Sequence, residues 1–159
     1  MQMSQTASPE DKLTALGLAL PHLPAPGGNC VSAKRVGAIV YLAGVISAGP
    51  DGVIAGTAGA DRTVEDGYGA TKACALTQLA VLRRELGTLN TIAEVLTVNG
   101  YVNAAPGFAD PPAVINGASD LLVRVFGDTG RHVRAAVGVS ALPRNAVVEV
   151  QMTVRVKEP

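Results

Sequence analysis

The chain has 159 residues, a length that suits one domain with a sizeable core and excludes a two-domain enzyme. Its 13 Lys and Arg residues balance 13 Asp and Glu residues, and aromatic residues make up only 3%, so nucleic acid is not an expected partner. Hydrophobic residues make up 48% and charged residues 16%, which excludes a disordered chain and suggests that much of the surface is covered by a partner.

Residues 1–27 are expected to form an N-terminal segment with one short helix and a loop. Residues 8–11, Ser-Pro-Glu-Asp, are a helix start, because Ser caps the first turn and Pro is favoured at the first helical position. The helix is predicted to end near Leu16, to stop at Gly17 and to pack as a lid or arm. An extended loop should follow, because proline and glycine then dominate: Pro21, Pro24, Pro26, Gly27 and Gly28.

Residues 28–159 are expected to form the main domain, which begins with strands. Residues 31–36 and 38–43 predict two strands that are joined around Gly37. The turn at residues 49–52, Gly-Pro-Asp-Gly, then leads into a short third strand near residues 53–55.

Two long helices alternate with the next strands. Thr63 and Asp66 make an imperfect capping box, because Glu or Gln is preferred at the second position, and they open a helix that should stop at Gly87. A strand is predicted at residues 92–102 and a second helix at residues 110–127. The apolar residues of the first helix recur at helical spacing: Val64, Tyr68, Ala75, Leu79, Leu82 and Leu86.

The last two strands are predicted at residues 133–140 and 147–157. The order is therefore roughly β-β-β-α-β-α-β-β, and right-handed crossovers would put both helices on one face of a mixed sheet. The other face is expected to present Ala, Gly and Val, which a monomer would not leave in water. We therefore expect a closed homo-oligomer in which sheets pack face to face.

The expected compartment is the cytoplasm, and no metal site is predicted. Uncharged stretches such as residues 36–50 are interrupted by Gly and Pro and fall short of the roughly 18 apolar residues that a membrane span needs. The N-terminus lacks the pattern of a secretory signal. Cys30 and Cys74 form no CxxC motif, and Cys74 is expected in a helix core; with His22 and His132 as the only histidines, the spacing supports no zinc site.

Arg134 and Glu149 are the residues best suited to chemistry. Strand alternation places Arg134 on one face with Ala136 and Gly138, so there is space above its guanidinium for a carboxylate held by two parallel hydrogen bonds. Glu149, on the polar face of the following strand, is a candidate to orient or deprotonate a water molecule. A second interpretation is a cross-strand ion pair of Arg134 and Glu149 at the sheet edge.

The C-terminal residues also carry a family pattern. Arg134-Ala-Ala-Val-Gly-Val-Ser-Ala-Leu-Pro143 is followed by Ala146-Val-Val-Glu149-Val, with support from Gly28-Asn-Cys-Val31, Val40-Tyr-Leu-Ala-Gly44 and Tyr101-Val-Asn103. From about residue 28 to its end, the chain thereby resembles the RidA/YjgF reactive intermediate deaminases, also known as L-PSP endoribonuclease-like proteins. The resemblance implies a single-domain α+β fold of the chorismate-mutase-like (bacillus) type, with two long helices on one face of a mixed sheet. It also implies a homotrimer with sites in the clefts between subunits.

The function implied by this resemblance is imine/enamine deamination. Small 2-imino acids of the 2-iminopropanoate and 2-iminobutanoate type would be hydrolysed to 2-oxo acids and ammonia, without a cofactor or metal. The matching residues imply that Arg134 holds the carboxylate and Glu149 helps to position the attacking water. The expected partners are therefore a small carboxylate-bearing metabolite and further copies of the chain.

The cleft wall departs from the family pattern. Cys30 stands where the family often has Tyr, Ala43-Gly44-Val45 replaces Ser-Gly-Gln, and Ala136 replaces a Cys of well-known members. Cys30, Gly44, Ala136, Tyr101 and Asn116 are candidate substrate-binding residues, although core or helix-surface roles suit Tyr101 and Asn116 as well. These departures keep a non-catalytic trimer that binds small carboxylates as an alternative, while zero charge and scarce aromatics disfavour an endoribonuclease.

Overall fold

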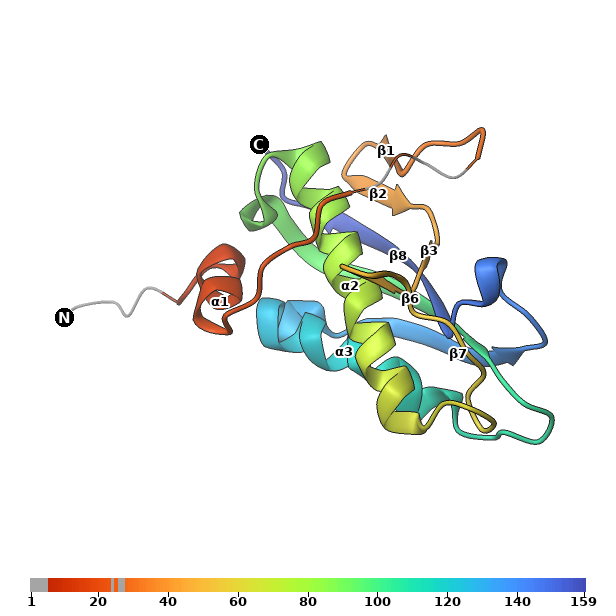
Figure 1. The fold of residues 1–159 in the computed structure, drawn as a ribbon. Coiled ribbons are helices and arrows are strands. Elements are labelled where there is room, and N and C mark those ends of the chain that lie inside the picture. The colour runs from red at the N-terminus through yellow and green to blue at the C-terminus, as the bar shows by residue number, and fades with distance from the viewer. Residues whose placement is uncertain (1–5, 24, 26–27) are drawn as a thin grey trace.

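A mixed sheet organises residues 6–23, 25 and 28–159, the part of the chain that the computed structural model describes (Figure 1). The sheet has its main strands in the spatial order β1 (Ala33–Val36), β2 (Ile39–Leu42), β8 (Val148–Val156), β6 (Ile92–Asn103) and β7 (Val133–Val139). A short strand, β3 (Val45–Ile46), also pairs with β8. The predicted loop residues Pro24, Pro26 and Gly27 lie outside the described residues.

Two small features differ from the predicted strand pattern. The third strand expected near residues 53–55 is β5 (Gly52–Val53), which pairs only with β4 (Ala48–Gly49) in a separate two-stranded sheet. Neither β3 nor β4 was predicted, because strands of two residues are too short to show an alternating pattern.

Both long helices cover one face of the main sheet, as predicted, and Figure 1 shows them side by side. Helix α2 (Val64–Leu86) begins with a complete capping box: Thr63 Oγ1 accepts from Asp66 N at 3.1 Å, and the Asp66 carboxylate accepts from Thr63 N at 2.9 Å. The helix ends at Gly87, whose φ of +84° favours glycine. Helix α3 (Pro111–Phe126) connects the parallel strands β6 and β7.

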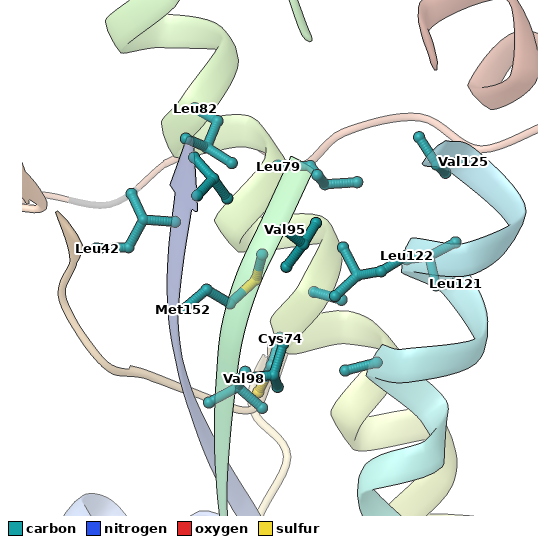
Figure 2. Close-up of a cluster of buried hydrophobic side chains, with 14 of the residues drawn as sticks. Leu42, Cys74, Leu79, Leu82, Val95, Val98, Leu121, Leu122, Val125 and Met152 are labelled. Carbon is teal, nitrogen blue, oxygen red and sulfur yellow. The ribbon is translucent and has the colours of Figure 1, made fainter. Parts of the chain in front are cut away.

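The core lies between these helices and the sheet. The strict alternation of β8 buries one face, which consists of Val148, Val150, Met152, Val154 and Val156. In Figure 2, Met152 and Val98 of the sheet lie among the side chains that α2 and α3 contribute. Cys74 of α2 is fully buried there, as predicted, and burial, with a smaller effect of the Glu149 charge, raises the pKa of its thiol. None of the helices in the described ranges is long and apolar enough to cross a membrane.

The short helix α1 (Pro9–Ala15) packs as an arm against α3 and against the 3-10 turn η1 (Leu89–Thr91). Its Leu13 is buried, and the Glu10 carboxylate accepts hydrogen bonds from Arg83 of α2 and from the Leu89 N–H at 3.0 Å. Glu10 N also donates to Asn90 Oδ1 at 3.1 Å, so the arm is tied to the main domain by apolar, charged and neutral hydrogen-bond contacts. The expected boundary between residues 1–27 and 28–159 stays a prediction.

The ion pair of Glu10 with Arg83 is expected to make a pH-dependent contribution to the free energy of unfolding. Burial alone raises the pKa of Glu10, but the hydrogen bonds from Arg83 and Leu89 and the Arg83 charge outweigh it, so the pKa lies below 4.5. A carboxyl with a lowered folded-state pKa stabilises the fold above its unfolded-state pKa and loses that contribution as the pH falls through the folded-state value.

We therefore expect Glu10→Gln to lower the free energy of unfolding by about 1 kcal/mol at neutral pH, a modest value because the ion pair is partly exposed. The difference in the free energy of unfolding between this variant and the wild type should vanish in acid, where Glu10 is protonated in both the folded and the unfolded state. Urea denaturation of both proteins across the acid range measures it, and a difference that is independent of pH would contradict the assignment.

The sheet face opposite the helices is not the Ala, Gly and Val surface that was expected. In its centre the outward positions of β6 and β8 are polar, and Asn99 Nδ2 donates to Gln151 Oε1 at 3.0 Å while Arg155 pairs with Glu94 at 2.8 Å. The exposed apolar side chains lie at the two margins of this face instead. They are Val36 and Tyr41 on β1 and β2, and Val133 and Val137 on β7.

The remaining turns close the ends of the sheet. The 3-10 turn η2 (Gly127–Gly130) joins α3 to β7, and η3 (Pro143–Asn145) joins β7 to β8. In η3, Arg144 and Asn145 both have positive φ, at 56° and 59°. Asn145 Oδ1 accepts a hydrogen bond from Asn103 Nδ2 at 3.1 Å, which ties this turn to the end of β6.

Candidate functional site

The residues predicted to form the site separate into two groups on opposite faces of the sheet. Tyr101 of β6 is the register partner both of Glu149 on β8 and of Val137 on β7, so these three side chains share the outward face. Arg134 is an odd number of residues from Val137 and therefore points to the face that α3 covers. We call the residues around Arg134 the helix-side group and those around Glu149 the outer group.

The helix-side group is built by β7 and α3. Arg134 Nη1 donates to Asn116 Oδ1 at 2.8 Å and to Ser119 Oγ at 3.1 Å, and both acceptors lie on one face of α3 because they are three residues apart. Ala136 follows on the same face of β7 and is half-buried. Among the described residues Arg134 forms no salt bridge, so its exposed guanidinium keeps its charge available.

His132 joins this group, although it is not among the candidate site residues predicted from the sequence. Its Nε2 lies 2.9 Å from Ser119 Oγ, and its Nδ1 lies 2.7 Å from the Gly130 carbonyl oxygen. Burial, opposed by the Gly130 hydrogen bond and assisted by the Arg134 charge, lowers the pKa of His132. His132 and Arg134 share a strand face at i and i+2, but no sequence pattern places Ser119 beside them.

The outer group is packed around Gly44. A Cβ atom at Gly44 would lie 3.2 Å from Glu149 Cδ and 3.3 Å from Glu149 Oε2, so the lack of a side chain there makes room for the carboxylate. Buried Gln78 of α2 fixes the chain around it, because its Nε2 donates to the carbonyl oxygens of Ala43 and Val150, both at 2.9 Å. The structure thus brings Gly44 and Tyr101 together with Glu149.

Cys30 belongs to neither group in a single chain. It is exposed in the segment before β1, and within the described residues no hydrogen bond joins it to the helix-side or the outer group. Its expected place on the cleft wall therefore stays a prediction.

The interpretation of Arg134 and Glu149 as a cross-strand ion pair is wrong. Strand β6 lies between β7 and β8, and the two side chains point to opposite faces. One chain therefore cannot bring both to the same ligand.

Two surface hollows lie away from both groups, one beside Tyr68 and Arg124 and one beside Arg35 and Leu86. The described ranges contain no group of three or more His, Cys, Asp or Glu side chains placed to hold a metal ion.

Comparison with known proteins relates most of the chain to one protein family. The family model described as "YjgF/chorismate mutase-like, putative endoribonuclease" matches residues 10–156. The chain is 40% identical over 144 residues to Protein TCP17 of Trypanosoma cruzi, covering 89% of this chain and 90% of that protein.

Two solved structures are also similar. The protein Atu1372 of Agrobacterium tumefaciens, described as of unknown function, is 36% identical with a TM-score of 0.85 and 94% of each chain covered. A protein of Shewanella oneidensis MR-1, described as a "putative endoribonuclease", is 32% identical with a TM-score of 0.89, covering 94% of this chain and 100% of that chain. With its mixed sheet and two covering helices, the chain belongs to the RidA/YjgF family of chorismate-mutase-like fold.

Proposed function

We propose that the protein hydrolyses small 2-imino acids to 2-oxo acids and ammonia, in clefts between the subunits of a homotrimer. The observation that carries the proposal is the environment of the Arg134 guanidinium. Its guanidinium is exposed, is held in place by two neutral acceptors and, within the described residues, has no acidic partner. An arginine fixed in this way is suited to bind a carboxylate with two parallel hydrogen bonds.

The chemistry needs little beyond positioning. The imine carbon of a 2-imino acid is already electrophilic, so water adds to it once the substrate is held in place. Glu149 would accept a proton from that water as the C–O bond forms. Glu149 then passes this proton to the nitrogen of the carbinolamine. As the C–N bond breaks and the carbonyl forms, the hydroxyl proton returns to Glu149, and ammonia leaves the 2-oxo acid behind. In this proposal Arg134 binds the carboxylate throughout and Glu149 acts on the water.

The trimer is supported by the two apolar margins of the outer sheet face. Val36 and Tyr41 lie at one edge of the sheet, while Val133 and Val137 lie at the opposite edge. When two different patches of one chain meet, the contact is head-to-tail, and repeated contacts of this kind form a ring when their rotation closes. Such a ring would place the β7 edge of one subunit, which carries Arg134, beside a neighbour. The homotrimer is the ring that is typical of the family.

Two other functions share parts of this site. A trimer that binds small carboxylates without turnover would use Arg134 but would not need Glu149. Ribonuclease activity, which the descriptions of the family and of the Shewanella protein mention, is disfavoured by the zero net charge and the 3% aromatic content.

The test is hydrolysis of freshly generated 2-iminopropanoate and 2-iminobutanoate, followed as loss of imine. We expect turnover by the wild type, a loss of roughly 100-fold in kcat/KM for Arg134→Ala, and a loss of roughly 100-fold in kcat for Glu149→Gln. Circular dichroism and thermal unfolding establish that the variants are folded.

Binding of 2-oxobutanoate without turnover, with loss of binding in Arg134→Ala only, would instead select the carboxylate-binding function. Cleavage of RNA that survives stringent purification and disappears in Arg134→Ala would select the ribonuclease. Either result would overturn the deaminase proposal.

A further inference from the structure

The guanidinium of Arg134 is held by only one of its three nitrogens. Nη1 makes both hydrogen bonds, to Asn116 Oδ1 at 2.8 Å and to Ser119 Oγ at 3.1 Å, and in the described part of the chain no bond reaches Nε or Nη2. A guanidinium has five N–H groups in one plane, two of them on Nη1. Both Nη1 hydrogens are therefore used, and the three on Nε and Nη2 remain.

We propose that Asn116, Ser119 and His132 are positioning residues that hold Arg134 through Nη1 and thereby present the Nε–Nη2 edge as the fork that binds the substrate carboxylate. The inference rests on the proposed function and adds residues that act through Arg134. Nε–H and one Nη2–H point in the same direction, and two parallel donors of this kind match the two oxygens of a carboxylate.

His132 determines how Ser119 contributes. The partner of His132 Nδ1 is the Gly130 carbonyl oxygen, which only accepts, so Nδ1 carries the proton. In the neutral ring Nε2 is then an acceptor, and the hydroxyl proton of Ser119 points to it across 2.9 Å. The lone pairs of Ser119 Oγ are thereby left for Arg134 Nη1. His132, Ser119 and Arg134 thus form a chain in which each donor has one defined acceptor.

The lack of charge on Asn116 and Ser119 matters for substrate binding as much as the positions of their acceptor oxygens. An aspartate or glutamate beside Nη1 would fix the guanidinium equally well but would neutralise the charge that attracts the substrate. Asn116 and Ser119 fix it without doing so. The substitution Asn116→Asp is therefore expected to be more harmful than Asn116→Ala, although it retains the acceptor oxygen.

The experiment separates positioning from folding through KM and kcat in the imine assay. Loss of one hydrogen bond to a charged group predicts a rise of roughly 10-fold in KM for Ser119→Ala. His132→Leu removes the acceptor that orients the Ser119 hydroxyl and should raise KM as well, and in both variants kcat should change by less than about 2-fold. Ser119→Thr keeps the hydroxyl and His132→Gln keeps an acceptor, so both should recover most of that rise. Arg131→Gln is the matched control, because it removes a nearby exposed charge that pairs only with Asp128 among the described residues.

A second measurement does not depend on turnover. In nitrogen-resolved NMR of the assembled protein, 2-oxobutanoate should shift the Arg134 Nε–H signal in the wild type at concentrations about 10-fold lower than in Ser119→Ala. The His132 ring should show the neutral form with the proton on Nδ1 at pH 7.

Equal KM values and equal 2-oxobutanoate affinities for wild type, Ser119→Ala and His132→Leu would overturn this inference while leaving the proposed function intact. A wild type that neither turns over imines nor binds 2-oxobutanoate would overturn the proposed function, and this inference with it.

Discussion

Mixed trimers that contain both Arg134→Ala and Glu149→Gln subunits are expected to recover about one third of the wild-type imine turnover, although each variant alone loses roughly 100-fold of its activity. In one chain these two residues point to opposite faces of the sheet and are separated by β6. The proposed deaminase site must then combine Arg134 of one subunit with Glu149 of a neighbour. Any ring of three that contains both variants has one junction at which the intact arginine meets the intact glutamate.

The measurement uses co-expression of the two variants with different affinity tags, followed by purification on both tags. Sedimentation of the product and of each parent establishes that all three are trimers. Mixed trimers as inactive as their parents would contradict a site shared between subunits. A stable monomer at micromolar concentration would contradict the ring itself.

The sequence predicted the elements of the fold more accurately than the arrangement of the site. Helix α2 begins at its capping box and ends at Gly87, and β8 has the predicted alternation, because these signals are local in the chain. The placement of both helices on one face followed from the handedness of crossovers, which is a general rule.

The separation of Arg134 from Glu149 was not predictable in the same way. The two strands are consecutive in the chain, but the parallel pairing of β6 with β7 places β6 between them. Strand order is a property of the whole sheet and leaves no local pattern. The contact of Ser119 with His132 was missed for a similar reason, since it depends on how α3 lies across the edge of β7.

The outer face was mispredicted for a different reason. Ala, Gly and Val are abundant in β7, but β6 and β8 form the centre of the sheet and alternate apolar residues toward the helices with polar residues outward. The apolar surface is therefore confined to the two edges. In the proposed trimer, that distribution would favour contacts between the edges of neighbouring subunits over the expected face-to-face packing of whole sheets.

Gly117→Ala is expected to destabilise the fold by about 2–4 kcal/mol, although alanine is the better helix former. Gly117 is the point at which α3 approaches the backbone of α2. A Cβ atom there would overlap the Tyr68 carbonyl oxygen and would lie 2.9 Å from its carbonyl carbon and 3.2 Å from Lys72 N. Backbone atoms of a packed helix cannot rotate away as a side chain can, so the helices must separate.

Gly69→Ala provides the control, because Gly69 is an exposed residue of α2 with no atom within 4 Å of an added Cβ. There the change should stabilise the protein by about 0.5–1 kcal/mol through helix propensity. Chemical denaturation of both variants measures the contrast, and equal effects at the two glycines would contradict the close approach. Gly117 directly follows Asn116, so the same separation of helices would move an acceptor of Arg134. Gly117→Ala that remains folded should therefore also raise KM.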